Sequence, residues 1–159
     1  MPQHSKDEQH VAENIADIAA QAIQGSVIVK EKLGITDGQM EAMYAVAFNQ
    51  FQKAAYDDAI QSFSLLCLLN PLEYKYMFGF ASSFYKKGSY ELASLYYVIA
   101  SKLDTGDPSP FLHAAECMLA INDTKGANEA LALTLSRIGD SPQYAPLRKR
   151  VESMLERIE

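Results

Sequence analysis

The sequence contains only two cysteines, Cys67 and Cys117, among its 159 residues. They lie far apart, and each sits within an apolar stretch of a predicted helix. Two such thiols cannot form the dense cysteine framework of a small disulfide-linked domain, and buried thiols of this kind are typical of a reducing compartment. We therefore expect no disulfide and a cytoplasmic location.

Long hydrophobic runs and clusters of positive charge are also scarce. No uninterrupted apolar run reaches the roughly 18 residues that a membrane span needs, and the N-terminus has no basic and apolar leader. Acidic residues outnumber basic ones by 20 to 14, which gives a formal net charge of −6. Such a chain repels phosphate backbones. We expect neither nucleic acid nor a membrane as a direct partner.

Catalytic motifs are absent as well. The eight glycines are scattered, and they form neither a phosphate-binding loop nor a nucleophile elbow. His113 and Cys117 are four residues apart, so they share a helix face and have the minimum geometry for two metal ligands. Two ligands do not complete a zinc site, and ordinary packing explains the pair more simply. We therefore predict no catalytic residue, no metal site and no cofactor, and hence not an enzyme.

What the sequence does contain is an internal period of 34 residues. Tyr56 recurs as Tyr90 and Phe63 as Tyr97, and two series of alanines repeat at the same offset. This period is typical of tetratricopeptide repeats, in which small residues let the two helices of each repeat approach closely. The two alanine series are Ala47, Ala81 and Ala115, and Ala59, Ala93 and Ala127.

The predicted fold is therefore all-α, with three tandem tetratricopeptide repeats in a curved helical solenoid. The repeats cover residues 40–73, 74–107 and 108–141, and the third is degenerate. Because stacked repeats need covered ends, residues 1–39 are expected to form an N-terminal helical extension and residues 142–159 a C-terminal capping helix. The capping helix is predicted to begin near the prolines at 142 and 146.

The N-terminal extension contains signals for two helices. Ser5 and Glu8 have capping-box spacing and predict a first helix that ends at Gly25, and a shorter helix is predicted from Ser26 to Leu33. Thr36 and Gln39 form a second capping box at the start of the first repeat. The first helix also has a narrow apolar stripe that we expect to form the contact of a homodimer. The stripe consists of Val11, Ile15, Ile18 and Ala22.

The resemblance to tetratricopeptide repeats implies a binding groove, because the first helix of each repeat lines the concave face in that family. Side chains at the groove-facing positions of this sequence form two apolar rows, which favour an extended apolar peptide. The alternative for any single ring is that it folds back into the repeat core. The predicted groove residues are Tyr44, Phe48, Phe51, Phe78, Ser82, Tyr85, Leu112, Glu116 and Leu119.

A narrower resemblance covers most of the chain. The stretch GSVIVKEKLGI from Gly25 to Ile35 and the stretch HAAECML from His113 to Leu119 resemble class II chaperones of bacterial type III secretion. This resemblance implies a cytoplasmic chaperone, associated with virulence, that keeps hydrophobic translocator proteins soluble before secretion by holding an extended segment in its groove.

The same resemblance implies further partners. Members of the family commonly form homodimers through the N-terminal helical region, here residues 8–35, and some bind a transcriptional activator. The alternative function is a tetratricopeptide-repeat scaffold that joins subunits of another cytosolic complex.

Overall fold

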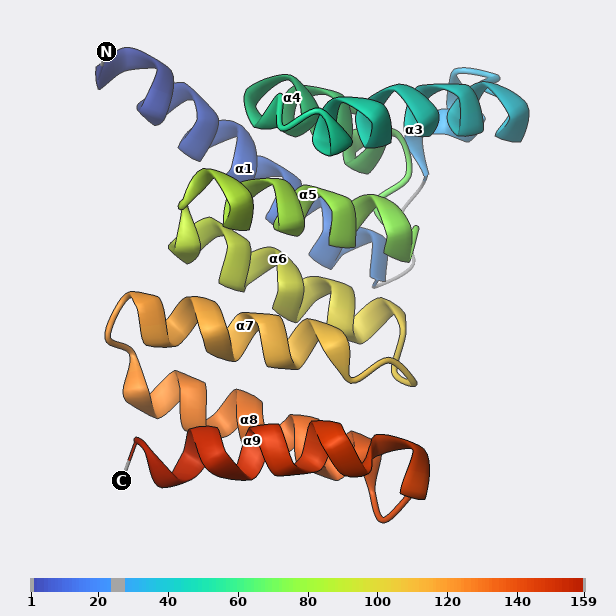
Figure 1. Ribbon diagram of the computed structural model, residues 1–159. Coiled ribbons are helices and arrows are strands. Elements are labelled where there is room, and N and C mark those ends of the chain that lie inside the picture. The colour runs from blue at the N-terminus through green and yellow to red at the C-terminus, as the bar shows by residue number, and fades with distance from the viewer. Residues whose placement is uncertain (1, 24–27, 159) are drawn as a thin grey trace.

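The computed structural model describes residues 2–23 and 28–158. All regular structure in these residues is helical, which confirms the predicted all-α solenoid (Figure 1). The elements follow one another as α1 (Pro2–Ile23), α2 (Val29–Lys32), α3 (Asp37–Gln52), α4 (Tyr56–Leu69), α5 (Tyr74–Lys87), α6 (Tyr90–Leu103), α7 (Ser109–Ala120), α8 (Thr124–Ile138), the 3-10 helix η1 (Pro142–Tyr144) and α9 (Ala145–Glu156).

Three helix pairs form the body of the solenoid: α3 with α4, α5 with α6, and α7 with α8. Each helix packs against the next along the chain. The six periodic alanines predicted at the helix contacts are all fully buried, at 0% exposure. A methyl group at these positions lets neighbouring helix axes approach closely, and the larger aromatic residues fill the spaces that remain.

Helix ends follow the local sequence. The Thr36 hydroxyl accepts a hydrogen bond of 3.2 Å from the Gln39 backbone N–H, and the Gln39 side chain accepts one of 2.8 Å from the Thr36 N–H. This reciprocal pair satisfies two N–H groups at the start of α3 and confirms the predicted capping box. The Asp123 side chain caps α8 by accepting a 2.9 Å bond from Gly126.

The turn inside each helix pair contains one residue in the left-handed conformation. Ala54, Gly88 and Asn122 have φ angles of 59°, 85° and 61°, and they are spaced by the same 34 residues as the alanines. Glycine adopts this conformation without strain and asparagine tolerates it, whereas an alanine Cβ clashes with the following carbonyl oxygen. Ala54 is thus the strained member of the series.

Replacing Ala54 with Gly is therefore expected to stabilise the protein by roughly 0.5–1 kcal/mol. Relief of the left-handed strain is worth about 1–2 kcal/mol, and the greater freedom of glycine in the unfolded chain offsets part of that gain. Urea unfolding measures the change. Ala45→Gly, at an exposed site inside α3, is the control and should lose about 1 kcal/mol. Equal destabilisation by both changes would contradict the prediction.

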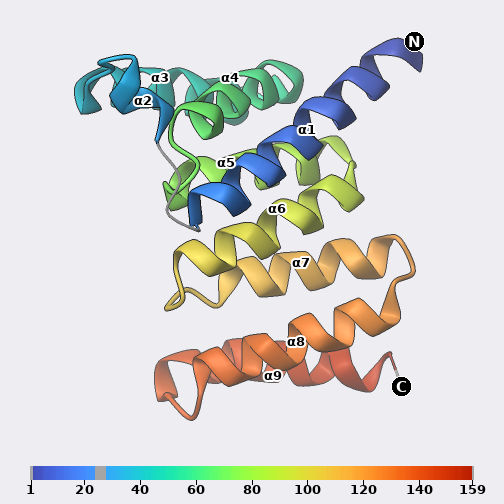
Figure 2. The same ribbon diagram turned by 180° about the vertical axis from the view of Figure 1, so that it is seen from behind.

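Helix α1 packs across α4 and α6, on the side of the stack opposite α5, α7 and α9 (Figure 2). Ile15 and Ala19 are fully buried in this contact, while Val11 is 41% exposed. Ile15 therefore belongs to the core of its own chain and is not available to a second protomer, which corrects part of the predicted dimer stripe. Ile18 is half-buried, and the side chain of Ala22 lies outside the described residues.

The start of α1 also differs from the prediction. The helix begins at Pro2, so Ser5 lies inside it and does not form its N-cap. Proline is favoured in the first turn because its fixed φ angle suits a helix and its missing N–H would have no partner there. The short helix α2 ends as predicted near Gly34, which has a φ of +65°. The expected start at Ser26 lies outside the described residues.

Buried apolar side chains form two clusters. The larger extends from Ile15 and Ala19 of α1 through α3 to α6 and includes Ala114 and Cys117 of α7. The smaller joins α7, α8 and α9 and consists of Leu112, Ala115, Ala130, Leu131 and Val151. Helix α9 starts at Ala145 with Pro146 in its first turn and packs against α8.

Candidate functional site: a two-part groove

Five of the nine predicted groove residues meet in one apolar pocket between α3 and α5, with a volume of about 180 Å³. We call it the aromatic pocket. Phe48 is 42% exposed, and the other four are partly buried. The pocket is lined by Tyr44, Phe48, Phe51, Phe63, Tyr74, Lys75, Phe78, Gly79 and Ser82.

Ring contacts fix the walls of the aromatic pocket. Tyr44 stacks on Phe48 and meets Phe63 edge-on, with ring centroids 6.0 Å apart in each case. Phe78 meets Tyr97 edge-on at 5.3 Å. Such edge-on and offset contacts are favourable for aromatic rings and hold them in place before any ligand arrives. Tyr44 and Phe78 thus serve the core and the groove at once.

Gly79 shapes the floor of the pocket. A Cβ at this position would lie 2.4 Å from two ring carbons of Phe63, which is buried in α4. The missing side chain therefore lets the Phe63 ring reach the pocket from the second helix of its pair. The groove prediction considered first helices alone and missed this contribution. A glycine inside a predicted helix was the available signal, since such a glycine usually has a packing reason.

Charged groups lie at the rim. Lys75 forms an ion pair with Glu41, one repeat earlier, and its Nζ lies 4.8 Å from the centroid of the Tyr44 ring. The Tyr74 hydroxyl donates a 2.5 Å hydrogen bond to Asp107. These contacts order the polar edge and leave the apolar walls open to a ligand.

The four remaining predicted groove residues lie farther along the solenoid. Tyr85 packs against Tyr90 and His113, with ring centroids 5.7 and 6.3 Å apart. Leu112 is only 5% exposed because it packs in the smaller core with Val151 of α9, so the prediction that it lines the groove is wrong. Glu116 and Leu119 line a second pocket instead.

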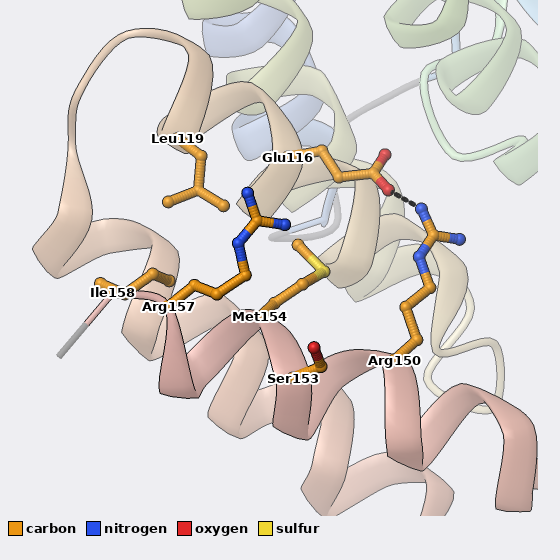
Figure 3. Close-up of a pocket in the computed structure, with 7 residues that line it drawn as sticks. All are labelled: Glu116, Leu119, Arg150, Ser153, Met154, Arg157 and Ile158. Carbon is orange, nitrogen blue, oxygen red and sulfur yellow. Dashed lines mark hydrogen bonds and ion pairs between the residues drawn. The ribbon is translucent and has the colours of Figure 1, made fainter.

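This second pocket has a volume of about 490 Å³ and lies between α7 and α9 (Figure 3). We call it the arginine pocket. Five of its residues were not predicted, although Arg150 stands 34 residues after Glu116 and so continues the groove positions into the capping helix. It is lined by Glu116, Leu119, Arg150, Ser153, Met154, Arg157 and Ile158.

Glu116 contacts His113 of its own helix and Arg150 of α9. It forms an ion pair with Arg150, and its Oε2 lies 3.0 Å from His113 Nδ1. Burial opposes ionisation of the Glu116 carboxyl, but these contacts outweigh it and hold its pKa below the ordinary value. Glu116 is therefore a carboxylate at neutral pH. Its ion pair engages Arg150, one of the two arginines of the pocket.

His113 and Cys117, the pair with the spacing of two metal ligands, have different surroundings. His113 contacts Glu116, whereas Cys117 is fully buried, and burial raises the pKa of its thiol to about 12. Within the described part of the chain, no three His, Cys, Asp or Glu side chains are grouped to hold a metal ion. No described helix combines the length and the apolar character needed to cross a bilayer.

The chain was compared with known protein families, proteins and solved structures. No family model matches the chain. Low calcium response locus protein H of Yersinia pseudotuberculosis is 35% identical over 124 residues, which cover 78% of this chain and 74% of that protein.

Two solved structures of the type III secretion chaperone SycD from Yersinia enterocolitica are also similar. Both are 34% identical and cover 78% of this chain. The structure in complex with a peptide of the translocator YopD has a TM-score of 0.71 and is covered over 95% of its chain. The structure described as an alternative dimer has a TM-score of 0.69 and is covered over 94%. The chain belongs to the family of type III secretion translocator chaperones.

Proposed function

We propose that this protein is a cytoplasmic bacterial chaperone that binds an extended apolar segment of a hydrophobic translocator and keeps the translocator soluble before secretion. The aromatic pocket is the observation on which the proposal rests. It presents Phe48, Phe51 and Phe78 around an apolar pocket of about 180 Å³. Apolar side chains that fill it gain about 25 cal/mol per Å² removed from water.

The comparison supports this assignment. SycD, which shares the fold, has been solved with a peptide of the translocator YopD. A translocator must later enter a membrane, so it exposes apolar surface in water and aggregates unless that surface is covered. An extended segment fits the groove because alternate side chains of a strand can enter pockets on one side.

Co-expression tests the proposal. A hydrophobic translocator produced with this chain is expected to remain in the soluble fraction and to co-purify with it, whereas the translocator alone should sediment. The measurement is the soluble fraction of translocator with and without the chain. Aggregation of the translocator in both conditions, with the chaperone folded, would refute the proposal.

The homodimer belongs to the same proposal. SycD is known in an alternative dimer form. We place the contact of this chain within residues 8–35, where Val11, Val29 and Leu33 are exposed, rather than on Ile15. Leu33, at 64% exposure, is the most exposed of these.

Leu33→Glu should therefore shift the sedimenting mass from dimer towards monomer, because a charge in an apolar contact loses its water without gaining a partner. Ile18, half-buried on α1, stays a candidate for the same contact. An unchanged dimer mass for Leu33→Glu would place the interface elsewhere.

A further inference from the structure

The groove continues beyond the aromatic pocket in a regular way. Phe48 and Ser82 line the aromatic pocket, and Glu116 and Arg150 line the arginine pocket. These four residues are spaced by 34 positions, so they occupy equivalent places on α3, α5, α7 and α9. The two pockets are therefore successive parts of one strip along the solenoid.

The chemistry of the strip changes along its length. The aromatic pocket is apolar, with Lys75 paired at its rim. The arginine pocket is lined by the apolar side chains of Leu119, Met154 and Ile158 and by two arginines. Figure 3 shows Arg157 reaching over the space between Leu119 and Glu116, with Arg150 on the other side of Glu116.

The two arginines differ in their partners. Arg150 forms an ion pair with Glu116. Among the residues that the structure describes, no carboxylate pairs with the guanidinium of Arg157, which is exposed at the pocket. An unpaired guanidinium beside apolar side chains suits a carboxylate from a ligand, because its fork of N–H donors matches the two carboxylate oxygens.

We propose that the arginine pocket binds an acidic residue, next to an apolar one, of the same partner segment whose apolar residues fill the aromatic pocket. The inference rests on the proposed function and specifies its ligand. A single carboxylate is favoured over a phosphate-rich ligand, because the chain has a net charge of −6 and Glu116 lies in the pocket itself.

The spacing of the two features in the ligand follows from helix packing. The pockets are separated by two steps from one groove-lining helix to the next, at roughly 10 Å a step. An extended peptide rises by about 3.3 Å per residue, so the carboxylate should lie roughly six residues from the main apolar anchor.

A double-mutant cycle tests the inference. The probe is the tightest-binding peptide from an overlapping set that covers the co-purified translocator, together with a copy in which the expected Glu or Asp is changed to its amide. Arg157→Gln should weaken binding of the carboxylate peptide about fivefold, as for an exposed ion pair, and leave the amide peptide unaffected. Lys149→Gln, an equal loss of charge on the exposed side of α9, is the matched control.

A reciprocal exchange provides the second arm. Arg157→Glu should reject the carboxylate peptide and recover affinity for a peptide with Lys at that position. Three results would overturn the inference: equal effects of Arg157→Gln on both peptides, equal effects of Arg157→Gln and Lys149→Gln, or a tight-binding peptide without a carboxylate near the predicted spacing.

The experiments distinguish failure of the arginine pocket inference from failure of the proposed function. If Phe48→Ala still weakens binding of both peptides while Arg157→Gln does not discriminate them, the arginine pocket inference falls and the chaperone assignment stands. If neither residue affects peptide binding, the groove itself is not the binding site.

Discussion

Changing Phe48 and Phe78 together to Ala is expected to weaken binding of a translocator peptide by at least about 100-fold. Buried aromatic anchors commonly lose 2 kcal/mol or more each on truncation, and about 1.4 kcal/mol corresponds to tenfold in affinity. The two rings belong to α3 and α5, and both line the aromatic pocket. Calorimetry with a peptide of the co-purified translocator measures the loss.

Two controls separate binding from folding. Val46→Ala removes an apolar side chain that is 55% exposed on α3 but does not line the pocket, so affinity should stay unchanged. Phe48→Ala alone should cost only about 1 kcal/mol in free energy of unfolding, because Phe48 is 42% exposed and lies outside the buried core. Parent-like affinity of the folded double variant would rule out the aromatic pocket as the main site.

Removal of the Arg137 guanidinium is expected to destabilise the protein by roughly 3 kcal/mol, because charged hydrogen bonds contribute about 1.5–3 kcal/mol each and their loss leaves acceptors unpaired. Arg137 lies in the last turn of α8. It donates to the backbone oxygens of Ser101, Asp104 and Asp107 at 2.5, 3.2 and 2.7 Å. The guanidinium carbon also lies 4.4 Å from the centroid of the Phe111 ring.

The carbonyl groups explain why one side chain has such an effect. Ser101 and Asp104 lie at the C-terminal end of α6, where carbonyl groups have no helical N–H partner and the helix dipole favours a cation. The guanidinium thus caps the C-terminal end of α6 and holds the segment that connects α6 to α7. No other residue type offers this fork of donors.

Urea unfolding of Arg137→Ala measures the effect, with Arg137→Lys as the conservative comparison. Lysine keeps the charge but cannot reach three acceptors in one plane, so it should recover only part of the loss. Arg148→Ala, which removes a half-buried arginine of α9 whose ion-pair partner Asp140 is fully exposed, is the control and should cost under about 1 kcal/mol. A loss below 1 kcal/mol for Arg137→Ala would show that the contacts are dispensable.

The repeated positions were the part of the structure that sequence could predict. Small residues such as Ala47, Ala81 and Ala115 recur because each occupies the same helix contact in successive pairs, and the structure buries all three fully. The capping box at Thr36 and Gln39 was likewise predictable, because its hydrogen bonds join residues only three apart. Local and periodic signals of this kind depend little on the rest of the fold.

What could not be predicted depends on contacts between elements that no period relates. The stripe on α1 indicates an apolar partner but does not name it, and the partner of Ile15 is α4 and α6 of the same chain. Leu112 occupies a groove position by register, yet it belongs to the smaller core together with Val151 of α9 and is only 5% exposed. Position within the repeat also does not reveal which groove-facing ring packs against the core. Tyr44 contacts the buried Phe63, whereas Phe48 remains 42% exposed.

The two apolar cores have a consequence for how the protein is made. Helix α1, helices α3 to α6 and one face of α7 share the larger core, against which most rings of the aromatic pocket pack. Helix α9 contributes only to the smaller core. Stacked repeats fold through contacts with their neighbours, and a chain emerges from the ribosome N-terminus first. We therefore expect the apolar binding surface to form on the nascent chain, before the last helix completes the arginine pocket.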